Sequence, residues 1–310
     1  MSRKEAIFLS LFVLVFAAGF IFYMKKIYKP KPAQAATQPA ANQTASAAVT
    51  VATPPSPGYQ TWTLPDVLKE ISGNVLAGND RMACIEDNEG IIYMYNLQSK
   101  KIDEEIQFAG KGDYEGIALV GDVYWVLRSD GFLFEVQPAK GGKPTVKTYD
   151  LPLTTENDTE SLFYDSEHKR LLVGVKEKDL TEKDKKGVYA FDLDKKRMNK
   201  EAAFYIDGEK KDKDDKDEDD KGKKKKKKKK EVKPSELAIH PKTGEIYVLD
   251  GPDSELLIVE PSGKIKSIQK LDKDVFPQPE GMSFSSDGSL YISSEAGKKG
   301  QAVIAKIELQ

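Results

Sequence analysis

The sequence predicts an all-β fold, a five-bladed β-propeller, on two observations. A turn, then a polar residue, then an apolar segment recur around Ser72, Glu115, Glu160, Glu236 and Glu280, at intervals of 43, 45, 76 and 44 residues. Each repeat also contains further short segments rich in Val, Ile, Leu, Phe and Tyr, separated by turns with Gly, Asp, Ser or Pro. A period of roughly 40–45 residues with several strands per unit is typical of propeller blades.

The strands can be followed within each repeat. The fourth repeat contains SELAIH, EIYVLD, ELLIVEP and KIKSIQKL, and the second and third repeats have the same four-strand order. The fifth repeat has only GMSFS, LYISSE and QAVIAKIEL. The segment YQTWTLP, residues 59–65, precedes the first repeat and has strand composition, so we expect it to supply the missing strand and close the ring. A different assignment around the stretch 208–232 would give six blades instead of five.

The long interval between Glu160 and Glu236 contains a charged insert, residues 208–232, with the sequence GEKKDKDDKDEDDKGKKKKKKKKEV. Removing the insert restores the period. Its acidic part does not match an EF-hand loop, because Asp220 and Lys226 stand where that loop needs Gly and Glu. The lysine run could bind anionic lipid or polyphosphate, but the composition favours a solvated, disordered loop.

Ahead of the propeller the chain divides into a short flank, 1–6, an apolar segment, 7–23, and a flexible linker, 24–58, rich in Pro, Ala and Thr. The uncharged segment 7–23 is long enough for a transmembrane helix, which needs roughly 17–25 residues. A cleavable signal peptide is the alternative, but lysines instead of small residues follow the apolar run. We therefore expect a single-pass anchor in the cell membrane, with the propeller, residues 59–310, outside the cytoplasm. The basic residues on the two sides of the segment are nearly balanced, so they do not settle the orientation.

Composition excludes several classes of function. The net charge of -2 and the predicted pI near 6.0 give no indication of nucleic-acid binding. The single cysteine, Cys84, excludes an intramolecular disulfide framework and a cysteine-built zinc site. The two histidines, His168 and His240, fall in turns between first and second strands, so we interpret them as surface residues on the face opposite the glutamates.

The glutamates are the candidate site, because the first strand of each propeller blade lines the central channel. Carboxylates that converge at the start of these strands repel one another unless they are protonated, paired with a cation or bound to a metal. Oxygen ligands without His or Cys suit Ca²⁺, and Mg²⁺ less well. The predicted metal ligands are Glu115, Glu160, Glu236 and Glu280. The second strands return to the same face and add possible rim contacts, which are Arg128, Lys176, Glu177, Asp250 and Glu295.

A purely structural role is the alternative for these glutamates. Each carboxylate could accept hydrogen bonds from backbone amides of the neighbouring blade and so lock the blades together, with Arg128 and Lys176 as counter-charges. Four acids outnumber the two nearby bases, which favours a metal over this lock.

The motifs ISG, DYEGIAL, DTESLFYD, PSELAIHPKTGEIYVLD and QPEGMSFSSDGSLYISSE give the chain a resemblance to a known family. The chain resembles the SdiA-regulated, YjiK-like family of bacterial propellers, which is distantly related to NHL-repeat propellers. The resemblance covers about residues 60–310 outside the insert. It implies a five-bladed propeller with a calcium site, in a bacterial membrane-anchored or exported protein, and places the calcium ligands among Glu115, Glu160, Glu236 and Glu280.

Two functions remain open from the sequence. The first is a membrane-anchored, calcium-binding module that presents its rim to a small-molecule or protein ligand. The second is a metal-dependent hydrolase of esters, lactones or phosphate esters. Its acid or base would come from Asp250, Glu295 or Glu177, and its substrate clamp from Arg128 and Lys176. A phosphatase of the phytate type would need more basic residues on this face.

Overall fold

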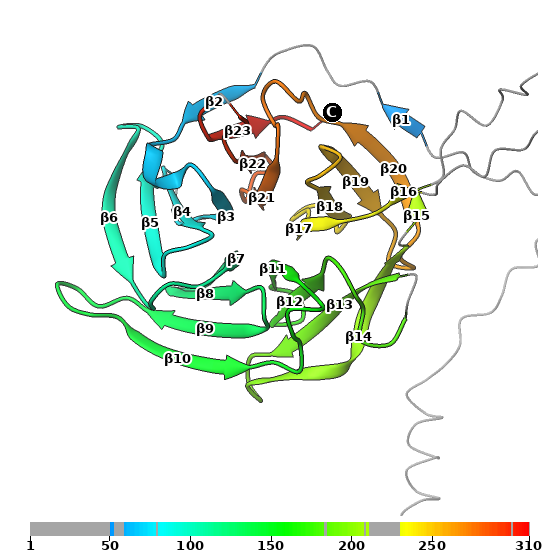
Figure 1. The fold of residues 1–310 in the computed structure, drawn as a ribbon, viewed down its shortest axis with the longest axis horizontal. Coiled ribbons are helices and arrows are strands. Elements are labelled where there is room, and N and C mark those ends of the chain that lie inside the picture. Colours follow the sequence, from blue (N-terminus) through cyan, green and yellow to red (C-terminus); the bar gives the residue numbers. More distant parts are fainter. Residues whose placement is uncertain are drawn as a thin grey trace, which may run out of the picture. The chain divides into compact units, whose positions relative to one another are not determined.

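The computed structural model describes residues 50–52, 59–78, 80–182, 185–207, 209–210, 230–298 and 300–309. Residues 48–310 form one compact unit. Within it, five sheets of four or five strands surround a common centre, as Figure 1 shows. The five-bladed propeller predicted from the repeat is therefore confirmed.

The first three blades each contain four consecutive antiparallel strands, numbered here from the centre outward. Blade 1 contains β3 (Ile71–Leu76), β4 (Arg81–Glu86), β5 (Ile91–Asn96) and β6 (Lys101–Gln107). Blade 2 contains β7 (Tyr114–Val120), β8 (Val123–Arg128), β9 (Phe132–Gln137) and β10 (Thr145–Asp150). Blade 3 contains β11 (Thr159–Asp165), β12 (Arg170–Val175), β13 (Lys185–Asp192) and β14 (Arg197–Asp207).

Blade 4 has a fifth strand on its outer edge. Its four central strands are β17 (Pro234–Ile239), β18 (Ile246–Asp250), β19 (Glu255–Val259) and β20 (Ile265–Lys270). The short strand β1 (Thr50–Ala52) pairs with β20 in parallel orientation. Three residues of the predicted linker 24–58 thus contribute a strand, which the composition of that segment did not indicate.

Blade 5 joins the two ends of the propeller sequence. It contains β21 (Pro279–Phe284), β22 (Leu290–Ser294), β23 (Val303–Ile307) and, on the outside, β2 (Gln60–Thr63). Gln60 pairs with Lys306 and Thr63 with Val303 in an antiparallel register. The prediction that the segment 59–65 closes the ring is confirmed. A short 3₁₀ helix, η1 (Asp66–Leu68), leads from β2 into blade 1.

The hydrophobic core lies between the blades. In the described residues, five buried clusters each join two neighbouring blades, because both faces of every central strand are covered. Trp125 of blade 2, for example, packs in one cluster with Phe191 of blade 3. The inner strands approach closely: a Cβ placed on Gly116 of β7 would lie 2.6 Å from the Cβ of Leu162 on β11. The spacing of the inner strands thus leaves little room for side chains at this level.

The charged insert, residues 208–232, begins and ends on the propeller. β15 (Glu209–Lys210) and β16 (Lys230–Glu231) pair at its base, and Val232 is fully buried in the core between blades 3 and 4. The predicted anchor, residues 7–23, lies outside the described residues. Among the residues that are described, no helix is long and apolar enough to cross a membrane.

Candidate functional site

A β-bulge stands at the start of every inner strand. The pairing of β3, β7, β11, β17 and β21 with its neighbour skips one residue near the first position. The residues that the bulge leaves unpaired are Ser72, Glu115, Glu160, Ser235 and Glu280. A bulge redirects the side chain that it carries, and such bulges are frequent next to functional sites. Five equivalent side chains therefore mark one end of the central channel.

This register changes the position of one predicted ligand. Ser235, not Glu236, is equivalent to Glu115, Glu160 and Glu280. The sequence repeat aligned Glu236 with the other glutamates because a shift of one residue is invisible in a spacing of about 45. In a strand, a shift by one residue directs the side chain to the opposite face.

Glu236 locks two blades. Its Oε1 atom accepts hydrogen bonds from the backbone N–H of Leu162 in blade 3, at 3.1 Å, and from that of Leu237, at 2.9 Å. The side chain is buried, and burial raises its pKa well above the ordinary value for glutamate. The structural alternative considered for all four glutamates thus describes this one.

The two serines in the set are also locks. Ser72 donates from Oγ to the backbone carbonyl of Tyr114 in the next blade, at 2.6 Å. Ser235 donates to the carbonyl of Pro279 in the next blade, at 3.0 Å. Each serine satisfies a carbonyl at the start of the neighbouring inner strand, so these two positions hold the ring together.

The remaining glutamates form an acidic group around one ammonium. Lys176, directly after β12, donates to Oε1 of Glu160, and both side chains are largely buried. The second oxygen of Glu160 is buried without a hydrogen-bond partner. Burial raises the pKa of Glu160 to about 8, although Lys176 opposes the shift. Burial works against the charge of Lys176, but Glu160 and Glu280 raise its pKa above the ordinary lysine value.

Glu115 has no such partner. Within the described residues it makes no hydrogen bond or ion pair. Burial and the charges of Glu160, Asp113 and Glu280 raise its pKa to about 10, and Lys176 offsets only part of this. For Glu280, burial likewise raises the pKa, opposed by Lys176 and by hydrogen bonds from Gln278 and Ser235. The acidic end of the channel therefore holds more carboxylate than its cation balances. We refer to Glu115, Glu160, Glu280 and Lys176 as the glutamate rim.

The profile of the SdiA-regulated family matches residues 78–297, which is most of the chain. The chain belongs to this family. No curated protein sequence matches it. Two solved structures share the fold: glutaminyl cyclase from Myxococcus xanthus has a TM-score of 0.53 at 13% identity and covers 80% of this chain and 94% of its own. A luciferin-regenerating enzyme has a TM-score of 0.51 at 12% identity, covering 81% and 96%. At these identities the likeness concerns the fold alone.

In this member of the SdiA-regulated family, three of the five predicted rim contacts bind partners outside the glutamate rim. Arg128 binds Asp130 through two nitrogens, at 2.8 and 2.9 Å, and its guanidinium lies over Phe132. Glu177 pairs with Lys233. Asp250 is buried and accepts a hydrogen bond from the backbone N–H of Lys233 at 3.1 Å.

Glu295, by contrast, belongs with the glutamate rim. Burial and then the charges of Glu280, Glu70 and Asp87 raise the pKa of Glu295 to about 8. Of the five predicted contacts, the structure thus places Lys176 and Glu295 electrostatically close to the rim glutamates.

Sequence reasoning missed a second set of polar residues near the rim, four of which are charged. Two residues before each bulge stand Glu70, Asp113, Asp158, Lys233 and Gln278. Asp113 and Asp158 raise the pKa of Glu115 and Glu160 respectively. The repeated triplets DYE and DTE, which contain these aspartates, were a signal that could have identified them.

The donor set fits a calcium ion chemically. All its donors are oxygens, and the unpartnered oxygen of Glu160 is a polar atom that a cation could satisfy. In the described part of the chain, however, no three His, Cys, Asp or Glu side chains are already gathered as a metal site.

Proposed function

We propose that the protein is a membrane-anchored binding module that takes up Ca²⁺ at its glutamate rim and presents the occupied rim to a small-molecule or protein ligand. The observation that carries this proposal is Glu115, a carboxylate held beside Glu160 and Glu280 without a hydrogen-bond partner in the described residues. Burial and the neighbouring charges now favour the protonated form of Glu115, and a divalent cation would stabilise the carboxylate instead.

The ligands in this proposal are Glu115, Glu160 and Glu280. Glu236 is not among them, because two backbone amides already occupy its Oε1 atom. Since no three acidic side chains among the described residues are gathered as a ready-made site, binding would require these glutamates to draw together and Lys176 to release Glu160. Calcium accepts variable oxygen geometry, which makes such an adjustment compatible with it.

Calorimetric titration of the full-length chain with Ca²⁺ tests the proposal. The double variant Glu115→Gln with Glu280→Gln keeps the size of both side chains and removes both potential charges. We expect saturable binding in the wild type and its loss in this variant. The control is Glu156→Gln, an exposed carboxylate paired with Lys178, which should bind as the wild type does. Equal heats from the wild type and the double variant would exclude calcium from the rim.

The membrane part of the proposal rests on the apolar segment 7–23. Deletion of this segment should move the protein from the membrane fraction to the soluble fraction. Protease added to intact cells should cleave the propeller if it lies outside the cytoplasm. Retention in the membrane after the deletion would contradict the anchor.

One observation favours a hydrolytic function as the second candidate. Glu295 is placed near Glu280, and its pKa of about 8 keeps most of this carboxyl protonated near neutral pH. A side chain of this kind can donate a proton to a leaving group. Turnover of an ester, lactone or phosphate ester that Glu295→Gln abolishes, with calcium binding intact, would favour catalysis over binding alone.

A further inference from the structure

A pocket lies on the propeller at the end of the inner strands opposite the glutamate rim. It has a volume of about 460 Å³ and opens between blades 3 and 4. The turn from β11 to β12, the turn from β17 to β18 and the middle of β14 contribute to its wall. This volume is within the range of roughly 300–1,000 Å³ that small-molecule sites occupy.

One part of the wall is apolar. Phe163, Phe204 and Phe284 line the pocket, together with Ile239 and Ile246. The three phenylalanines are only partly buried, although each packs against a core cluster. Apolar side chains that face a concave space and stay partly open to solvent are the usual lining of a ligand pocket.

The other part of the wall is polar and already organised. Asp165, at the end of β11, is buried and accepts hydrogen bonds from His168 Nδ1 and Arg170 Nε, both at 2.8 Å. The same carboxylate accepts the backbone N–H of His168 at 3.3 Å. Asp165 therefore fixes the orientation of an imidazole and a guanidinium, and both of these side chains line the pocket.

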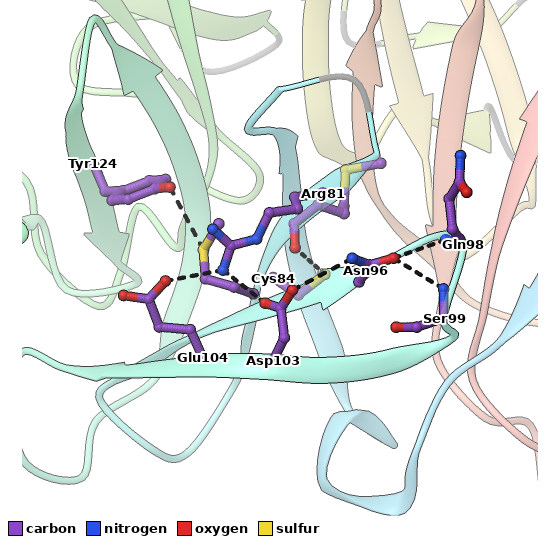
Figure 2. A network of polar contacts seen from close by, with 10 residues as sticks. Arg81, Cys84, Asn96, Gln98, Ser99, Asp103, Glu104 and Tyr124 are labelled. Atoms are coloured by element: carbon purple, nitrogen blue, oxygen red, sulfur yellow. Dashed lines mark hydrogen bonds and ion pairs between the residues drawn. The ribbon is translucent and has the colours of Figure 1, made fainter.

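The guanidinium of Arg170 retains donor capacity. Only its Nε atom makes a hydrogen bond or ion pair within the described residues, and the side chain is 28% exposed. The equivalent residue of blade 1, Arg81, is the first residue of its second strand in the same way. Figure 2 shows the Arg81 guanidinium between Asp103 and Glu104, with Nη2 at 2.6 and 2.9 Å from their oxygens. In blade 1 two carboxylates of the protein bind a terminal nitrogen, whereas in blade 3 both terminal nitrogens are available.

The terminal nitrogens of Arg170 are donors in the pocket that remain for one negative group. Besides Asp165 and Arg170, the ionisable side chains that line it are the exposed Glu167, the phenol of Tyr164 and the imidazoles of His168 and His240. His240 uses Nδ1 to accept the backbone amides of Lys242 and Thr243, so its Nε2 carries the hydrogen of the neutral ring. One guanidinium and two imidazoles, offset by two carboxylates, are too little positive charge for a polyphosphate.

We propose that this pocket binds small monocarboxylic acids with an aromatic or acyl body. The carboxylate would be bound by the terminal nitrogens of Arg170, beside His168, and the apolar body would lie against Phe163, Phe204 and Phe284. A guanidinium matches a carboxylate with two parallel hydrogen bonds, and this geometry provides the specificity for the head group. The site is independent of the glutamate rim, so it stands whether or not the rim binds calcium.

Ligand-observed NMR titration of the full-length chain with phenylbutyrate tests this proposal. The matched probes are the neutral phenylbutyramide and the cationic phenylbutylamine, which keep the apolar body and change the head group. We expect saturable binding of the carboxylate and at least roughly tenfold weaker binding of the other two, as loss of a charge-assisted hydrogen bond predicts. Equal binding of acid and amide, or no binding of the acid at millimolar concentration, would overturn the proposal.

Two variants locate the binding. Arg170→Met should weaken binding of the acid at least roughly tenfold, whereas the matched control Arg81→Met should leave it unchanged. Because Arg170→Met also removes a partner of Asp165, a second variant avoids that contact. Ala203 is exposed and lines the pocket, so Ala203→Trp should fill the space and abolish binding without disturbing the core. Unchanged binding in Ala203→Trp would show that the acid binds elsewhere. Competition by inorganic phosphate as strong as that by acetate would contradict selectivity for a carboxylate.

Discussion

The two ends of the inner strands treat buried carboxylates in opposite ways. At the glutamate rim, burial raises the pKa of Glu160 and Glu115, and the single ammonium of Lys176 offsets only part of the effect. At the other end, the Asp165 side chain is also buried, and burial again acts to raise its pKa. Hydrogen bonds from Arg170 and His168 outweigh it and hold that pKa below the ordinary value.

The comparison shows that cationic partners outweigh burial at Asp165, whereas at Glu160 burial outweighs the ammonium of Lys176. Glu236, at the rim end of its strand, shows the effect of neutral hydrogen-bond donors. It accepts two hydrogen bonds, as Asp165 does from its side-chain partners, but the donors are neutral amides and its pKa stays well above the ordinary value. The neutral amide donors thus do not offset burial at Glu236, whereas the hydrogen bonds from Arg170 and His168 do so at Asp165.

The largest effect on stability is expected from Glu236→Ala. The change removes the acceptor of two buried amides, those of Leu162 and Leu237, at the joint between blades 3 and 4. Unsatisfied buried donors cost about 1–3 kcal/mol each, so with two of them the free energy of unfolding should fall by about 2–6 kcal/mol. Urea denaturation measures this difference.

Glu236→Gln is the matched control, because it keeps the carbonyl acceptor and loses only the ionisable group. It should retain nearly the stability of the wild type near pH 7. An equal loss in the Gln and Ala variants would mean that the charge, and not the two hydrogen bonds, holds the joint.

A smaller effect is expected on the pH dependence of stability, which should differ between the two ends of the inner strands. Because the folded-state pKa of Glu236 is raised, its contribution is present below the ordinary glutamate pKa and is lost as pH rises towards the folded value. Because that of Asp165 is lowered, its contribution is present above the ordinary aspartate pKa and is lost as pH falls through the folded value. Glu236→Gln should therefore reduce the loss of stability as pH rises above the ordinary glutamate pKa. Asp165→Asn should reduce the loss of stability as pH falls below the ordinary aspartate pKa.

Thermal unfolding from acid to alkaline pH, with a chelator present, records both slopes. Each variant should change the dependence of the melting temperature on pH in one of the two pH ranges and leave it unchanged in the other. A variant that changed it in both ranges would indicate that the two carboxylates are coupled across the blade.

The smallest effect concerns the serine locks. Ser72→Ala removes one hydrogen bond to the carbonyl of Tyr114, and the free energy of unfolding should fall by about 1 kcal/mol. Ser72→Thr keeps the hydroxyl and tests whether the bond or the small size of the side chain matters. If urea denaturation gives equal stability for Ser72→Ala and the wild type, the serine is not a lock.

Much of this arrangement could be predicted from the sequence. The period, the four-strand units and the composition of YQTWTLP were sufficient for the blade number and the closure, because turns and alternating apolar residues are local signals. The sequence also indicated that the glutamates lie at one end of the channel, because this depends only on the direction of the inner strands.

The rest depended on register and on partners. The bulge places Ser235, and not Glu236, at the position equivalent to the other three glutamates. A sequence period of about 45 residues does not reveal a difference of one residue, although one residue changes the face of the strand. His168 lies in an exposed turn, as expected, but nothing in the letters DSEHKR indicates that the neighbouring blade leaves a pocket beside that turn. The strand Thr50–Ala52 was missed because its partner β20 is more than two hundred residues away in the sequence.

The closure of blade 5 has a consequence for how the protein is made. Gln60 is translated early and Lys306 among the last residues of the propeller, yet the two pair in one sheet. Four strands of each of blades 1 to 4 follow one another in the chain, but the ring stays open until β23 is available to pair with β2. Until then the edges of β2 and β22 are both unpaired and available to another nascent chain. The pairing of β2 with β23 is therefore the step that removes these two open edges.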